Sequence, residues 1–290
     1  MRLHGCLAAL WLAVAAQAAE TRDLLIVAGQ SNAVGYDAKP SELAPDDRDK
    51  EVMFWWRSGD PPPDKHDTTS GGKWTHLQPQ SLGDPMKPRN GRTRQYGNFA
   101  QTEGGFGPEI GMARALLKAQ PDRKLAIVKA AFSGTGIRRD WDPKSGGDNG
   151  SCYRALIEET HTAIKAAEKN DLELRVRAFV WVQGESDANA ANAEHYEKAL
   201  REMINSLRKD LDAPEMTALV AVNTRFGGGN NKFMPAIVEA QKAVGVADKR
   251  CAYVDTAKAT IANNAHYDTE GTLYVGRLFA ESLLRLEAKR

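Results

Sequence analysis

The chain has 290 residues, of which 42% are hydrophobic and 27% charged, a balance typical of a globular protein that builds its own core. Lys and Arg together number 39 and Asp and Glu 38, so the formal net charge is only +1. This charge balance gives no electrostatic reason to expect a nucleic acid or an anionic membrane as a partner. The length suits one large α/β domain or two small ones.

The first 18 residues have the pattern of a secretory signal peptide. Arg2 precedes an uninterrupted apolar run at 6–16, and small residues at Ala16 and Ala18 form an A-x-A exit. The run is too short to span about 30 Å of hydrocarbon as a helix. We therefore expect cleavage near Ala18, a secreted or periplasmic protein, and no stable membrane insertion afterwards.

Short apolar runs rich in β-branched residues alternate with helical patterns along the rest of the chain. The runs lie at 24–28, 125–130, 176–182, 216–222 and 252–254. Runs of this kind suit strands that are covered on both faces, as in a parallel sheet. They predict a three-layer α/β/α domain over residues 19–290, with a mainly parallel five-stranded sheet and right-handed crossovers.

Helical patterns fill several of the gaps between these runs. Pro108 and Pro235 are each well placed to begin a helix, since the missing N–H of proline would be unsatisfied there anyway. Apolar residues at spacings of three and four mark further helices at 196–211 and 275–286.

Residues 37–106 are the exception, because they are rich in Pro, Gly and charge and lack helical periodicity. We interpret this stretch as a long irregular insertion, with a short hairpin at most, that lies over the C-terminal edge of the sheet. Its aromatic residues Trp55, Trp56 and Trp74 either stack on sugar faces or form a small core of the loop itself.

Polar residues follow four of the predicted strands, where open α/β sheets place their ligand sites. Ser31 lies in a Gly-Gln-Ser-Asn turn after the first strand, and Gly134 follows the second. Gln183 and Glu185 follow the third strand, and His266 lies beyond the last. A histidine at this edge can act as a general base on the serine.

Five segments in order make the chain resemble the SGNH-hydrolase superfamily, and within it the sialate O-acetylesterase-like and carbohydrate esterase family 6 branch. They are GQSN at 29–32, FGPE at 106–109, SGTGI at 133–137, QGESD at 183–187 and HYDTEGTLYVG at 266–276. The resemblance implies a flavodoxin-like three-layer fold, Ser31 as nucleophile and metal-free deacetylation of sugars. It also implies an oxyanion hole formed by the N–H groups of Ser31 and Gly134 and the side-chain amide of Gln183.

The chain departs from the family pattern at Asn263, where an aspartate often stands three residues before the histidine. Asparagine can orient an imidazole but cannot stabilise the imidazolium that forms during catalysis. Glu185 is our first candidate for the supporting acid. The alternatives are Asp268 and Asp187, with Asn263 in an orienting role only.

Further residues carry weaker signals. Asn32, Trp55, Trp74 and Arg138 are candidates for substrate binding, although an arginine near a loop is often simply a surface residue. No metal-binding motif is present, so we expect no catalytic metal and no cofactor. Outside the leader, Cys152 and Cys251 either pair in an oxidising compartment or remain separate buried thiols.

The sequence thus predicts a serine-dependent carbohydrate O-acetylesterase that acts through an acyl-enzyme on acetylated xylan, sialic acid or a related glycan. Two alternatives remain. The departure at Asn263 fits a glycan-binding protein with weak or no catalysis, and the same fold also hosts esterases that act on substrates other than sugars.

Overall fold

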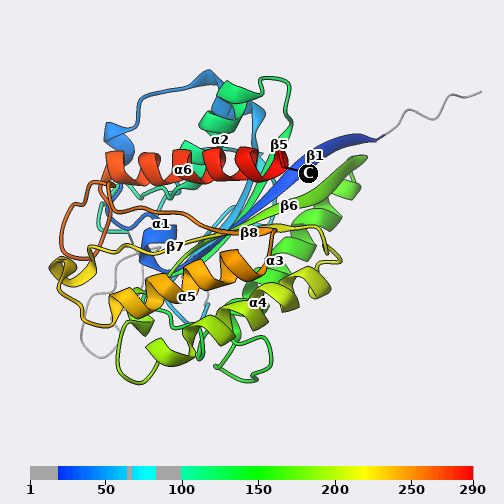
Figure 1. The fold of residues 1–290 in the computed structure, drawn as a ribbon. Coiled ribbons are helices and arrows are strands. Elements are labelled where there is room, and N and C mark those ends of the chain that lie inside the picture. Colours follow the sequence, from blue (N-terminus) through cyan, green and yellow to red (C-terminus); the bar gives the residue numbers. More distant parts are fainter. Residues whose placement is uncertain (1–18, 64–66, 83–98, 290) are drawn as a thin grey trace, which may run out of the picture.

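A twisted sheet of eight strands runs through the middle of the molecule, as the computed structural model shows for residues 19–63, 67–82 and 99–289 (Figure 1). The strand order is β3-β2-β5-β1-β6-β7-β8, and β4 also pairs with β2. The strands are β1 (Glu20–Gly29), β2 (Met53–Gly59), β3 (Thr68–Thr69), β4 (Thr75–His76), β5 (Leu125–Phe132), β6 (Leu172–Val182), β7 (Thr217–Ala221) and β8 (Cys251–Tyr253). All pairings are parallel except those of the short strands β3 and β4.

Helices cover both faces of this sheet and give three layers (Figure 1). One face carries α1 (Ser31–Val34), α2 (Glu109–Ala119) and α6 (Thr269–Glu287). The other face carries α3 (Ser151–Glu168), α4 (Tyr196–Asp210) and α5 (Met234–Ala247). The predicted three-layer fold class is therefore confirmed.

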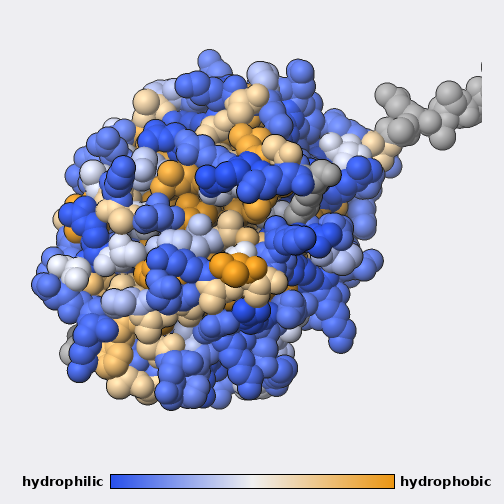
Figure 2. All heavy atoms as spheres, viewed as in Figure 1, coloured by the Kyte–Doolittle hydropathy of each residue, from blue (hydrophilic) through white to orange (hydrophobic). Residues whose placement is uncertain are grey.

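The central strands are buried on both sides, which explains their unbroken apolar runs. Every residue of β5 and β7 is buried, and alternate side chains of β1 enter the two separate apolar clusters above and below the sheet. Hydrophilic residues dominate the face seen in Figure 2, with apolar ones in smaller patches between them. Among the described residues, Val246 is the one large hydrophobic side chain that is fully exposed.

The predicted count of five strands is wrong, because the stretch interpreted as an irregular insertion contributes three more. Its apolar segment forms β2, which pairs in parallel with β5 and lies inside the sheet rather than over its edge. Trp55 and Trp56 of this strand are buried, one on each face. Aromatic residues suit a strand that packs on both sides, so this segment belongs to the core.

The strand order reverses at β1, and this position determines where the site lies. From β1 the chain passes to β2 and β5 on one side and then crosses to β6, β7 and β8 on the other. Gly29, the last residue of β1, is therefore flanked by Ala131 of β5 and Val182 of β6. Open α/β sheets bind their ligands at the carboxyl ends of strands at such a switch point.

The predicted signal peptide, residues 1–18, lies outside the described residues. In the part of the chain that is described, no helix combines the length and the apolar character needed to cross a membrane.

Candidate active site

Ser31 is the first residue of α1 and lies at the carboxyl end of the central strand β1. It is 8% exposed, so it is largely buried at the carboxyl edge of the sheet and does not lie on a protruding loop. Its carbonyl oxygen accepts the N–H groups of Gly35 and Tyr36, at 2.9 and 3.1 Å. Gly35 has φ +85°, and an added Cβ would overlap the carbonyl oxygen of Phe106, so the tight turn after Ser31 requires glycine.

The side chain of Asn32 fastens the loop that carries His266 next to Ser31. Its Oδ1 accepts the N–H of Tyr267 at 3.0 Å, and its Nδ2 donates to the carbonyl of Ala265 at 3.0 Å. The two residues that flank His266 are thus both bound to the residue that follows Ser31. The loop that carries His266 is therefore fastened to the residue after Ser31, and the polar atoms of Asn32 are used within the protein.

The imidazole of His266 is held by a carboxylate that the sequence analysis missed. Its Nδ1 lies 2.7 Å from Oδ2 of Asp37, and the ring of Tyr36 packs against it with the ring centroids 4.4 Å apart. The same Asp37 oxygen accepts Nδ2 of Asn263 at 2.8 Å. Burial by itself raises the pKa of Asp37, but the hydrogen bonds from His266 and Asn263 outweigh it, so this pKa lies below its usual range.

Glu185, our expected supporting acid, is not brought to the ring of His266. Its Oε1 accepts Nδ2 of Asn32 at 2.9 Å and the N–H of Asn223 at 3.1 Å. Its side chain is buried, and this burial raises the pKa of its carboxyl despite the hydrogen bonds. Glu185 therefore anchors the Asn32 clamp, and within the described part of the chain it makes no hydrogen bond to His266.

The other acids considered in its place also have structural partners. Asp268 caps α6 by accepting the N–H of Gly271 at 2.7 Å. Asp187 accepts the N–H of Ile137 at 2.9 Å and Nε2 of Gln183 at 2.6 Å, so it holds the turn after β5. Asn263 accepts the N–H of His266 at 3.1 Å while it donates to Asp37.

Gly134 lies just after the carboxyl end of β5, the strand next to β1, and is exposed. It has φ +69° and no atom within 4 Å of the position that a Cβ would take, so a ligand can approach its backbone closely. Within the described residues, neither the N–H of Gly134 nor that of Ser31 has a protein acceptor. These two N–H groups are thus available to an oxyanion.

Gln183 is fully buried, and its side-chain amide is already used within the protein. Its Nε2 donates to the carbonyl of Thr135 at 2.9 Å and to Asp187, and its Oε1 accepts the hydroxyl of Tyr196 at 2.9 Å. Both amide hydrogens therefore have acceptors. The structure places Gln183 as a brace under the Gly134 turn, which differs from the oxyanion-hole donor expected from the sequence.

Trp55 and Trp74, the two tryptophans considered for substrate binding, pack together against the core. Trp55 is 1% exposed and donates to Glu159 at 2.7 Å, and Trp74 packs against it edge-on and donates to the carbonyl of Ala163 at 2.9 Å. Both pack against α3 as part of the main core of the domain, so they form neither a separate core of the loop nor a stacking surface for sugar.

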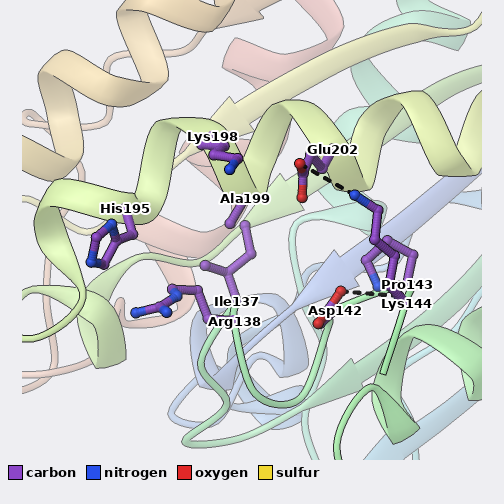
Figure 3. Close-up of a pocket in the computed structure, with 9 residues that line it drawn as sticks. All are labelled: Ile137, Arg138, Asp142, Pro143, Lys144, His195, Lys198, Ala199 and Glu202. Carbon is purple, nitrogen blue, oxygen red and sulfur yellow. Dashed lines mark hydrogen bonds and ion pairs between the residues drawn. The ribbon is translucent and has the colours of Figure 1, made fainter. Parts of the chain in front are cut away.

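Arg138, by contrast, is exposed beside the Gly134 turn. It lines a hollow of about 440 Å³ together with Gly134 and Asn192, and also a neighbouring one of about 260 Å³ with Lys144 and His195. Figure 3 shows Arg138 and His195 among the side chains that line the second hollow. No ion pair of Arg138 occurs within the described part of the chain.

A buried ion pair supports α1 from below. Nζ of Lys129, in β5, lies 2.8 Å from Oε1 of Glu109 and donates to the side chain of Gln80 at 2.7 Å and to the carbonyl of Val34 at 2.9 Å. Neither charged side chain is exposed, and burial lowers the pKa of Lys129 in spite of its carboxylate partner. The last residue of α1 is thereby tied to the sheet.

Cys152 and Cys251 are separate buried thiols, which decides between the two alternatives. Burial raises the pKa of both, that of Cys251 to about 12. Over the residues with described positions, no group of three or more His, Cys, Asp or Glu side chains is arranged to hold a metal ion.

The parallel sheet with its serine after β1 and its histidine before α6 places the chain in the SGNH-like hydrolase class. A family model described as "Carbohydrate esterase, sialic acid-specific acetylesterase" matches residues 21–285. The chain belongs to this family of carbohydrate acetylesterases.

Solved structures share the fold at low sequence identity. A protein from Arabidopsis thaliana superposes with a TM-score of 0.64 at 21% identity, over 91% of this chain and 98% of the other. NanS superposes with a TM-score of 0.61 at 18% identity, over 94% of this chain and 100% of the other. A carbohydrate acetylesterase from Xanthomonas citri superposes with a TM-score of 0.58 at 17% identity, over 93% of this chain and 57% of the other. No curated protein matches the sequence significantly.

Proposed function

We propose that this protein is a serine-dependent carbohydrate O-acetylesterase in which Ser31 is the nucleophile and His266 the general base. The observation that supports the proposal is the Asn32 clamp, which binds the backbone on both sides of His266 and so fastens its loop to the residue that follows Ser31. The family to which the chain belongs supplies the reaction class.

Acyl transfer to Ser31 follows from this arrangement. As Oγ attacks the ester carbonyl carbon, its proton passes to Nε2 of His266 and the carbonyl π electrons move onto oxygen. When the oxyanion collapses, the bond to the sugar oxygen breaks and His266 returns its proton to that oxygen. Water then attacks the acetyl-enzyme and loses a proton to His266, which releases acetate and restores the Ser31 hydroxyl.

The developing oxyanion is stabilised by the N–H groups of Ser31 and Gly134. The backbone of both residues is fixed before the reaction. Ser31 is held through the hydrogen bonds to its carbonyl from Gly35 and Tyr36, and the turn around Gly134 is held by Asp187 and Gln183. We assign Gln183 this bracing role.

The sugar lies in the hollow that begins at Gly134. Its lining is mostly polar and includes Ser186, Asn192 and Arg138, side chains that can hydrogen-bond to hydroxyl groups. Arg138 gives the hollow an exposed positive charge that suits an acidic sugar. Sialic acid carrying O-acetyl groups therefore fits this site better than neutral acetylated xylan. The leader pattern of residues 1–18 supports an exported protein that meets such glycans outside the cytoplasm.

The test is acetate release from a panel of acetylated glycans, comparing the wild type with Ser31→Ala. We expect the variant to lose activity by at least about 10³-fold while it keeps its fold. Arg138→Gln is expected to weaken activity on O-acetylated sialic acid more than on acetylated xylan. A Ser31→Ala enzyme that releases acetate at the wild-type rate would exclude the mechanism.

A further inference from the structure

We propose that Asp37 is the carboxylate that orients and electrostatically supports His266 during catalysis, and that Asn263 positions Asp37 for this role. The inference rests on the function proposed above. It assigns the supporting acid to the segment that immediately follows the nucleophile, at a position that nothing in the sequence patterns singles out.

The contact of Asp37 with His266 has the geometry that the role requires. Oδ2 lies 2.7 Å from Nδ1, so the ring donates its Nδ1–H to the carboxylate, and the lone pair of Nε2 remains free to take a proton. The side chains of Asp37 and His266 are 12% and 17% exposed, which limits screening of the charge by water.

The backbone on both sides of Asp37 makes hydrogen bonds of its own. The carbonyl of Tyr36 accepts the N–H of Ala100 at 2.8 Å, and the N–H of Lys39 donates to Oγ1 of Thr269 at 2.9 Å. Residues on either side of Asp37 are thus bound to two separate parts of the chain. A carboxylate held in this way restricts the imidazole instead of following it.

Asn263 completes the arrangement from the loop that carries His266. Its Nδ2 donates to the same oxygen of Asp37 that binds the ring, and its Oδ1 accepts the backbone N–H groups of Ala265 and His266. A neutral donor stabilises the ionised form of Asp37, whereas an aspartate at 263 would bring a second negative charge against it. Asparagine at this position is therefore expected once the carboxylate comes from Asp37.

The other groups around the ring do not provide this support. Tyr36 offers its ring face, Lys39 is an exposed cation near Asp37, and Glu185 lies within electrostatic range but is bound to Asn32 and Asn223. None of these three residues is a carboxylate hydrogen-bonded to His266, as Asp37 is.

The test measures kcat and KM for 4-nitrophenyl acetate across a range of pH in Asp37→Asn. We expect kcat to fall by about 10²–10⁴-fold with KM nearly unchanged, because the variant keeps the site but loses the charge that stabilises the imidazolium. The acidic limb of kcat/KM against pH should move to lower pH, since the ring loses its negative neighbour. Asp47→Asn, at an exposed ion pair with Lys50, is the matched control and should behave like the wild type.

Two results would overturn the inference: wild-type kcat in Asp37→Asn, or a reduced kcat whose acidic limb stays in place. If the variant does not fold, proton NMR of the wild type still decides. A downfield Nδ1–H signal that disappears in His266→Gln supports the inference, and a ring protonated on Nε2 instead contradicts it. Wild-type activity in Ser31→Ala would overturn the proposed function itself, so the two failures are distinguishable.

Discussion

The buried ion pair between Lys129 and Glu109 supports a prediction of stability and of activity together. Replacing Lys129 by Met leaves the buried Glu109 carboxylate without its cation, with Gly107 and Gln80 as its remaining donors, and removes the donor to the carbonyl of Val34. Breaking one side of a fully buried pair costs about 3–5 kcal/mol. We expect the free energy of unfolding to fall by about 4 kcal/mol and the melting temperature by about 10 °C.

The cost should come mainly from the unpaired charge, and a second substitution tests this. In Lys129→Met/Glu109→Gln the glutamine keeps an acceptor for the N–H of Gly107, which donates to the carboxylate at 2.9 Å, but carries no charge. The double variant should therefore recover about half of the loss. Lys50→Met, at an exposed pair, is the control and should keep nearly the stability of the wild type.

Urea unfolding followed by tryptophan fluorescence measures all four proteins, and esterase activity under native conditions measures the second effect. Because Val34 ends the helix that begins with Ser31, the single variant should also lose kcat. The reasoning is refuted if Lys129→Met stays within about 1 kcal/mol of the wild type, or if the double variant is no more stable than the single one.

Two further predictions concern the turn after the nucleophile and the C-terminal helix. Gly35→Ala should lose at least about 2 kcal/mol of stability and most of its activity, because φ is +85° and the new Cβ meets the carbonyl of Phe106. Chemical denaturation and ester hydrolysis measure the two effects, and wild-type values in both would contradict the prediction. Glu287 is partly buried, which raises its pKa, but Arg123 and Arg177 lower it more, so its pKa lies below the usual range. The stability that ionised Glu287 contributes is then present above about pH 4 and is lost as the pH falls through the lowered pKa. Glu287→Gln should therefore be about 1 kcal/mol less stable than the wild type at pH 7 and equally stable in acid. A difference in stability that persists in acid would refute the assignment.

Much of the fold follows from local patterns in the sequence. The five apolar runs predict β1, β5, β6, β7 and β8, because strands buried on both faces need no polar alternation. The strand β2 could not be predicted in the same way. Its apolar residues Met53–Trp56 stand in a long stretch of Pro, Gly and charge, and only pairing with β5 shows that they belong to the sheet.

Ser31, Gly134 and His266 could be predicted because each follows a strand, and the topology of a parallel sheet brings strand ends together. Asp37 could not, because its contact with His266 joins residues 229 positions apart and depends on the turn at Gly35. The signal available in the sequence was only a Tyr-Asp pair soon after the nucleophile, in a stretch with many other acids.

For Glu185 and Gln183 the position was predicted from the sequence, but the role of the side chain was not. Their position at the sheet edge was predicted, but position alone does not tell which hydrogen bonds a side chain makes. The amide of Gln183 is taken up by Thr135 and Asp187, and the carboxylate of Glu185 by Asn32 and Asn223. Both residues support the site from below, since a buried polar group takes the partners that the packed interior offers.

The most direct test of the account is to trap the covalent intermediate on Ser31. Wild-type protein and Ser31→Ala are mixed with 4-nitrophenyl acetate, quenched in acid during the first turnovers, digested and analysed by mass spectrometry. The account predicts one added acetyl group on the peptide that contains Ser31 in the wild type, and none in the variant. Acetylation of another residue during turnover, or full activity in Ser31→Ala, would contradict it.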